Sequence, residues 1–497
     1  MRRSGILMAI SSLPSPYGIG CFSKSAYAFV DSLKEAGQTY WQILPLGPTG
    51  YGDSPYQPFS AFAGNPYFVD LDQLAQEGLL QPEEYQLLDF GIDPQQVDYN
   101  KIYQNRLPVL KKAYLAFLAQ ELDKDEEYRA FCEKQKNWLE DYSLYMAVKY
   151  QFGQKSWADW EDDIRLRKPE AVRKYQELCE KEIGFYRFVQ YEFMKQWIKL
   201  KTYANEKGIQ IVGDIPIYVA FDSSDSWAMP ELFQYNEDRQ PTRIAGCPPD
   251  AFAADGQLWG NPLYDWEYHE NTGYAWWIKR MERCYELYDV VRVDHFRGFD
   301  EYYAIPFGAQ TAADGCWQPG PGMKLFTALS EHFGQTPIIA EDLGYLTDTV
   351  IKLVKDTGYP GMKVIEFAFD SRESGDYMPY RYDHNCVVYT GTHDNQTLAA
   401  WYDELSAQDR AFLDDYLDLK GMQKEGIVWS LIRCALETVA DTVIVPMQDY
   451  LCLGAECRMN QPSTQGRNWK WRMKEDAFTQ ELAAKIRHLT KIYGRIE

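Results

Sequence analysis

Eight short runs of apolar, often β-branched residues recur along the chain. Runs of this kind are typical of strands that are buried on both faces of a parallel sheet. They occupy residues 6–10, 40–46, 209–219, 289–296, 337–343, 363–369, 386–394 and 442–451. A single short run can equally belong to a buried helix, so the prediction depends on the number of runs rather than on any one of them.

Helical patterns separate most of these runs. Between the first two, SAYAFVDSLKEAGQTY has apolar residues at three-to-four spacing, and Gly37 is a stop signal near its end. An alternation of strand and helix repeated eight times is typical of one α/β architecture, the (β/α)8 TIM barrel. We therefore predict that residues 1–497 form a single catalytic barrel.

The spacing of the runs is uneven, which predicts two large insertions. Residues 47–208, after the second run, read as largely helical and charged, whereas residues 220–288, after the third, are rich in Pro, Gly, Asp and Trp. Loops of this length are usually functional, and those after barrel strands build the walls of an active site. Only a short helical pattern follows the eighth run, so we expect no C-terminal β-sandwich domain.

Composition narrows the possible partners. A net charge of -22 argues against nucleic acid or an anionic membrane surface, whereas a neutral sugar polymer is compatible with it. Solubility alone would also explain the acidity. The ten cysteines lack the spacing of a disulfide framework or a zinc site, and no export signal or transmembrane run is visible. These features predict a cytoplasmic protein with reduced thiols.

Three of the runs end in a carboxylate: Asp294 in VRVDHFRG, Glu341 in AEDLG and Asp394 in GTHDN. Barrel enzymes keep their chemistry at the carboxyl ends of the strands. Two carboxyl groups flanking a sugar linkage are what glycosidic bond cleavage requires. The combination predicts an enzyme that processes sugars.

Each carboxylate also has an alternative, structural explanation. Arg292 precedes Asp294 by two residues on the same strand face, so we expect it to lower the carboxylate pKa, although the two could form only a buried ion pair. Burial would raise the pKa of Glu341 and suit it to general acid work, or it could be a structural carboxylate. Asp394 could be a helix N-cap, and Asp214 in GDIPIYV a turn residue.

Aromatic residues in polar loops suggest sugar stacking. Segments 52–68 and 246–266 are rich in Gly and Pro and carry rings such as Trp259 and Tyr264. Simple loop packing would also explain them.

Taken together, the motifs resemble the amylomaltase family, the 4-alpha-glucanotransferases of glycoside hydrolase family 77. The motifs that match in type and order are DSPYQ, GDIPIYV, PPDAF with GQLWGNP, VRVDHFRG, AEDLG, GTHDN and RMNQPSTQGRNWKWR, across residues 53–472. The resemblance implies that Asp294 is the nucleophile, Glu341 the general acid/base and Asp394 the third carboxylate, which holds sugar hydroxyls. It implies substrate contacts from Tyr56, Asp214, Asp250, Gln257, Trp259, Arg292, His295, Asp370, His393 and Asn460. Ala251 stands where some members carry an aromatic residue on the acceptor side.

The implied activity is transfer of a segment of a 1,4-alpha-D-glucan to the 4-hydroxyl of another glucan or glucose. It would proceed by retaining double displacement, with maltooligosaccharides as donor and acceptor and with no cofactor or metal. A hydrolase of the α-amylase type is the nearest alternative, against which the GQLWGNP and RMNQPSTQ loops argue. A glucan-binding protein on an inactive barrel is the other, and the three carboxylates argue against it.

Overall fold

Eight parallel strands form the central sheet of the computed structural model, which describes residues 2–50, 52–249, 255–344, 346–370, 375, 377–464 and 466–496. Their order across the sheet is β10-β11-β12-β1-β2-β3-β6-β9. The strands are β1 (Arg3–Leu7), β2 (Tyr40–Gln42), β3 (Gln210–Pro216), β6 (Val290–Asp294), β9 (Ile338–Ala340), β10 (Gly361–Val364), β11 (Cys386–Tyr389) and β12 (Thr442–Pro446). The N–H of Ala340 in β9 donates to the carbonyl of Pro360, directly before β10, at 3.0 Å. This contact brings the two edge strands together, so the sheet forms the predicted barrel.

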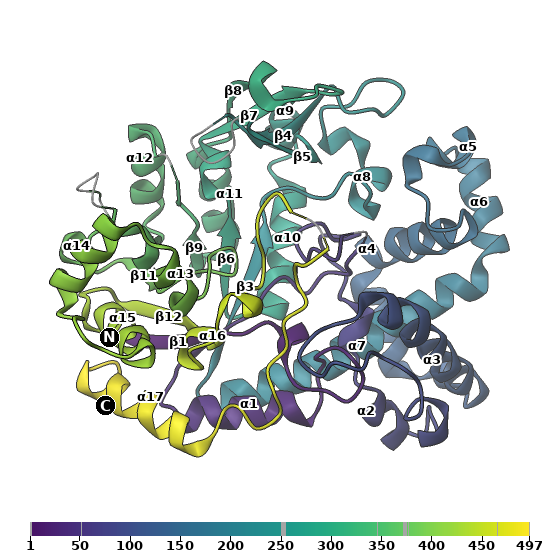
Figure 1. The fold of residues 1–497 in the computed structure, drawn as a ribbon. Coiled ribbons are helices and arrows are strands. Elements are labelled where there is room, and N and C mark those ends of the chain that lie inside the picture. Colours follow the sequence, from purple (N-terminus) through teal and green to yellow (C-terminus); the bar gives the residue numbers. More distant parts are fainter. Residues whose placement is uncertain are drawn as a thin grey trace.

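A ring of helices surrounds the strands (Figure 1). Its members are α1 (Lys24–Glu35), α7 (Glu180–Glu206), α10 (Ala275–Leu287), α11 (Met323–Phe333), α12 (Asp348–Thr357), α15 (Lys424–Glu437) and α17 (Gln480–Ile492). Neighbours in the ring pack on one another, in the order α15, α17, α1, α7, α10, α11 and α12. Between β10 and β11, however, the described residues form only the 3-10 turns η9 (Ile365–Phe367) and η10 (Pro379–Arg381).

Every predicted run overlaps an observed strand, but two of the runs begin inside their strand and end well beyond it. The run at 6–10 extends past the end of β1 into the 3-10 turn η1 (Ile10–Ser12), and the run at 363–369 extends past β10 into η9. Most residues after these strands remain buried, with Phe367 as the exposed exception. Apolar character therefore continues beyond the last hydrogen bond of the strand, and the sequence pattern cannot show where that bond is.

Apolar side chains from six of the strands fill the barrel interior. One buried cluster contains Leu7, Val212, Ile339, Met362, Val364, Val387, Tyr389 and Ile444. Side chains two apart on a strand share a face, so Asp214 points inward like Val212. The intervening Gly213 packs against Tyr288, where a Cβ would come within 2.1 Å of the tyrosine ring. A larger residue at 213 would displace the strand that carries Asp214.

The segment between β2 and β3 is largely helical. Ahead of α7 it forms α2 (Leu71–Gln76), α3 (Tyr99–Ala119), α4 (Glu126–Gln151), α5 (Asp162–Arg165) and α6 (Pro169–Leu178), which lie on one side of the barrel (Figure 1). Helices α4 and α7 pack along each other. This unit therefore joins the barrel through α7, which also belongs to the outer ring.

The segment after β3 contains more regular structure than its loop-like composition predicted. Besides α8 (Ser224–Ala228) and α9 (Trp266–Asn271), it forms β4 (Arg243–Cys247) and β5 (Gln257–Pro262). These strands pair antiparallel with β7 (Glu301–Pro306) and β8 (Cys316–Pro319), in the order β5-β4-β7-β8. The small sheet joins the loops that follow β3 and β6, and it lies at the top of the view in Figure 1.

The remaining helices cover the later strands. They are α13 (Leu398–Glu404) and α14 (Ala407–Leu417) after β11, and α16 (Met447–Tyr450) after β12. Across the part of the chain that the structure describes, no helix is both long and apolar enough to cross a membrane.

Candidate active site

Strand register places Asp294 and Glu341 next to each other. In the parallel ladder between β6 and β9, Val293 pairs with Ala340. The N–H of Glu341 donates to the carbonyl of Val293 at 3.1 Å. The two carboxylates are therefore the next residues along two neighbouring strands, both at the carboxyl end of the barrel, where this fold carries its chemistry.

A buried arginine connects the first of these carboxylates to β3. Nη1 of Arg292 donates to both carboxylate oxygens of Asp214, at 2.7 and 2.8 Å, and lies 3.0 Å from Oδ1 of Asp294. Burial opposes the charge of Arg292, but Asp214 and Asp294 outweigh it and raise its pKa well above the usual value. Asp214 is thus a buried partner of Arg292 within β3, and the alternative of a turn residue is wrong.

Glu341 is held by backbone N–H groups. Its carboxylate accepts from the N–H of His295 at 2.6 Å and from the N–H of Leu343 at 3.0 Å. Burial and the negative charge of Asp294 nevertheless raise the pKa of Glu341 to about 8. Glu341 therefore carries a proton at neutral pH, as a general acid must.

Arg292 lowers the pKa of Asp294, as expected, but this is not the largest effect on that group. Burial raises the pKa of Asp294 above its usual value, and Arg292 only opposes that rise. Because Arg292 touches Asp294 directly while Glu341 receives only backbone donors, the proton of the pair resides on Glu341. Asp294 is then the ionised member, and its side chain is 30% exposed. Arg292 and Asp294 do form an ion pair, but the Asp294 carboxylate remains accessible from the cavity.

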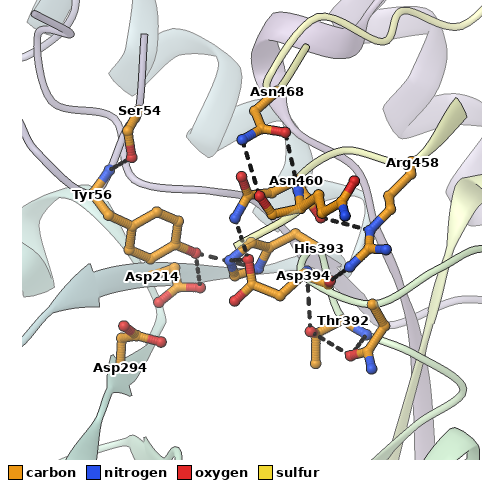
Figure 2. Close-up of polar contacts among 12 residues, drawn as sticks. Ser54, Tyr56, Asp214, Asp294, Thr392, His393, Asp394, Arg458, Asn460 and Asn468 are labelled. Atoms are coloured by element: carbon orange, nitrogen blue, oxygen red, sulfur yellow. Dashed lines mark hydrogen bonds and ion pairs between the residues drawn. The ribbon is translucent and has the colours of Figure 1, made fainter. Parts of the chain in front are cut away.

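Asp394 lies across the site in the loop between β11 and α13 (Figure 2). Nδ2 of Asn460 donates to its Oδ1 at 2.6 Å, and Nη2 of Arg458 donates to its backbone carbonyl at 2.6 Å. The N-cap of α13 is Thr397, whose side chain accepts from Ala400. Asp394 is therefore not the N-cap of the following helix, and its carboxylate, 43% exposed, faces the site.

Tyr56 and His393 form a stacked pair beside these carboxylates. Their ring centroids are 4.9 Å apart at an interplanar angle of 15°. The Tyr56 hydroxyl donates to Asp214 at 2.8 Å and lies 3.3 Å from Nδ1 of His393 (Figure 2). Trp469 packs against both rings, at 5.8 and 5.9 Å. Segments that are far apart in the sequence thus meet in one rigid wall.

A cavity of about 710 Å³ opens over this arrangement. The side chains around it come from segments 52–68, 246–266 and 458–472, from the carboxyl ends of β3, β6 and β11, and from the connection between β7 and β8. The predicted residues that line it are Tyr56, Gln257, Trp259, Asp294, His295, His393, Asp394 and Asn460. Trp259 meets the His295 ring edge-on, with centroids 4.8 Å apart. Burial lowers the pKa of His295 to about 3, so this histidine is neutral at physiological pH.

The other predicted residues are placed differently. Asp214 and Arg292 are buried beneath the cavity, and neither the half-buried Glu341 nor the half-buried Asp370 is among the residues that line it. Asp250 and Ala251 lie outside the described residues.

Several lining residues were not singled out from the sequence. Gln310 and Thr311 come from the connection between β7 and β8, and Trp469 from the loop that leads to α17. The first two carry no sequence signal, because only the pairing of β7 with β4 brings their loop to the site. Within the described ranges, no group of three or more His, Cys, Asp or Glu side chains is arranged to hold a metal ion.

Comparison with known proteins confirms the resemblance that the motifs indicate. The family model described as 4-alpha-glucanotransferase matches residues 8–479. A 4-alpha-glucanotransferase of Clostridium butyricum is 50% identical over 99% of this chain and 100% of its own length, and one of Streptococcus pneumoniae serotype 4 is 49% identical over 100% and 98%. The solved amylomaltase of Streptococcus agalactiae in complex with acarbose superimposes with a TM-score of 0.96 at 44% identity, and each chain is covered completely. The chain belongs to the 4-alpha-glucanotransferase family.

Proposed function

We propose that this cavity transfers a segment of a 1,4-alpha-D-glucan to the 4-hydroxyl of a second glucan or of glucose. Asp294 is the nucleophile, Glu341 the general acid and base, and Asp394 binds sugar hydroxyls of the reacting glucose unit. The observation that carries this assignment is the register of β6 and β9, which sets two carboxyl groups side by side. Arg292 favours the charge on Asp294, and burial raises the pKa of Glu341. Retaining glycosidic chemistry needs such a pair.

In the first half-reaction, a glucan binds with one linkage between the two carboxyl groups. Asp294 attacks the anomeric carbon while Glu341 gives its proton to the departing glycosidic oxygen. The carbon–oxygen bond of the linkage breaks, an ester bond to Asp294 forms, and the shortened glucan leaves with the proton. Arg292 keeps Asp294 ionised until it attacks.

In the second half-reaction, the roles reverse. Glu341, now a carboxylate, takes the proton from the 4-hydroxyl of an incoming sugar, and that oxygen attacks the anomeric carbon. The ester to Asp294 breaks and the original configuration is restored. The wall formed by Tyr56, His393 and Trp469 and the loop that carries Trp259 limit the access of water, which suppresses hydrolysis of the intermediate.

The product pattern tests transfer against hydrolysis. Maltotriose alone is expected to give glucose and a ladder of longer glucans with little net gain in reducing ends, because transfer conserves their number. Chromatography measures the ladder, and a reducing-sugar assay on the same samples counts the ends. A steady rise in reducing sugar without any product longer than the donor would assign the protein to the hydrolases.

The pH dependence tests the assignment of Glu341. Since burial and Asp294 raise the pKa of Glu341 to about 8, the acid is protonated below that pH and is lost above it. We expect kcat/KM for maltotriose to fall about tenfold per pH unit on the alkaline side of that value. A profile that stays flat to about pH 10, or that declines from the ordinary glutamate pKa near 4.3, would contradict the assignment.

We also propose that the whole chain acts as one catalytic unit, with residues 47–208 and 220–288 as insertions into the barrel, and that it works in the cytoplasm on maltooligosaccharides. None of the ten cysteines forms a disulfide in the described part of the chain, which suits a reducing compartment.

A further inference from the structure

A buried carboxyl group lies behind the loop that carries Asp394. Glu366 belongs to the turn η9 after β10, and its residue is only 9% exposed. Its Oε1 is buried and has no hydrogen-bond partner among the described residues. Gly391 makes room for the group, because a Cβ at 391 would come within 2.9 Å of Oε1. The backbone that follows β11 therefore passes close to the Glu366 side chain, and a residue larger than glycine at position 391 would contact it.

Asn395 connects Glu366 to the loop. A Cβ at Gly391 would meet both Oε1 of Glu366 and Cβ of Asn395, at 2.9 and 3.2 Å, so the two side chains lie next to each other, and Asn395 opposes the rise in the pKa of Glu366. Oδ1 of Asn395 accepts from both the N–H and the hydroxyl of Thr392, at 2.9 and 2.7 Å. With Oδ1 committed in this way, only the amide nitrogen of Asn395 is available as a donor to Glu366.

Thr392 completes the connection to Asp394. Its hydroxyl oxygen accepts from the N–H of Asp394 at 3.2 Å (Figure 2). On the opposite side, Arg458 holds the carbonyl of Asp394 and Asn460 holds its carboxylate. One of the two supports of Asp394 therefore leads back, through Thr392 and Asn395, to a neighbouring buried acid that does not line the cavity.

The surroundings of Glu366 favour its neutral form. Burial and the nearby Asp449 raise its pKa well above the usual value, against the opposing effects of Asn395 and Arg458. Asp449 itself accepts from the hydroxyl of Thr390 at 2.7 Å and from the N–H of Leu398 at 2.9 Å. Asp449 thus has two hydrogen-bond donors for a negative charge, whereas Oε1 of Glu366 is buried without a partner among the described residues.

We propose that Glu366 is a positioning residue for glucan transfer: through Asn395 and Thr392 it fixes the loop that aims Asp394 at the reacting sugar. The proposal rests on the role proposed above for Asp394. It predicts that shape and neutral hydrogen bonding matter at position 366 and that negative charge does not.

Three variants test this. Glu366→Gln keeps the shape and an oxygen that accepts from Asn395, so it should retain at least about a third of the wild-type kcat on maltotriose, since a preserved neutral hydrogen bond differs little in energy. Glu366→Ala should lower kcat by about 10- to 100-fold with KM little changed, since small misplacements of catalytic groups act on the transition state. Equal losses in both variants would overturn the proposal.

A double-mutant cycle separates positioning from general stability. If Glu366 acts through Asn395, the double variant Glu366→Ala/Asn395→Ala should have the same kcat as the single variant Asn395→Ala. If the fold losses of the two single variants instead multiply in the double variant, the proposed route is contradicted. The matched control is Glu192→Ala, a buried glutamate on α7 that pairs with Lys195. It should lower Tm but leave kcat unchanged well below the Tm.

Asp394→Ala is measured alongside. If that variant stays active, the role of Asp394 fails. If it is inactive while Glu366→Ala retains full kcat, only the positioning role of Glu366 fails.

Discussion

Asp294→Ala is expected to abolish glucan transfer while the protein remains folded. Removing a covalent nucleophile should lower kcat/KM by at least about 100-fold, or about 2.7 kcal/mol of barrier. Folding should survive because Arg292 keeps its two hydrogen bonds to Asp214. The measurements are the transfer rate on maltotriose and the thermal unfolding midpoint. Activity above about a hundredth of wild type in a folded variant would count against the assignment.

Azide provides a second readout for the same variant. In the space left by the carboxylate, azide can attack the anomeric carbon of an α-maltosyl fluoride from the face that Asp294 used, and fluoride leaves from the other face. The expected product is the β-maltosyl azide, identified by NMR. An azide product of α configuration would place the nucleophile elsewhere. So would a variant whose activity is the same with and without azide. The wild-type enzyme, which retains configuration, is the control.

The barrel and its central carboxylates could be predicted because they depend on short-range patterns. An apolar run that ends in an acidic residue places that residue at the carboxyl end of a strand, and strand order in a barrel then brings Asp294, Glu341 and Asp394 toward one opening. Asp214 was predicted for the same reason. Its bond to Arg292 follows from the register of β3 and β6, in which the two residues are direct neighbours.

The features that could not be predicted from the sequence depend on pairing between distant segments and on burial. Gln310 reaches the cavity only because β7 pairs with β4, a contact between two separate loops. The sequence predicted the lowering effect of Arg292 on the pKa of Asp294, but not the extent of burial, which has the larger and opposite effect. Glu366 did carry a signal, as a lone acidic residue inside the apolar run KVIEFAF. A charge in such a run marks either a partner or a neutralised acid.

The second large effect concerns Glu341. Glu341→Gln removes the proton that a departing sugar needs, so transfer from maltotriose should fall by about 100-fold or more. A glycosyl fluoride needs little protonation to leave, so the variant should still form the ester to Asp294 from α-maltosyl fluoride.

That ester should then persist, because its breakdown needs the missing base, and mass spectrometry should find the adduct on the peptide that contains Asp294. The matched control is Asp342→Asn, which removes a negative charge one residue along. Asp342 accepts from the N–H of Met362 at 2.7 Å and takes no part in the proposed reaction, so that variant should keep its transfer activity on maltotriose. If the Glu341→Gln variant uses maltotriose and the fluoride equally poorly and accumulates no adduct, Glu341 is needed for something other than proton transfer. In that case the division of roles between the two strand-end carboxyl groups would have to be abandoned.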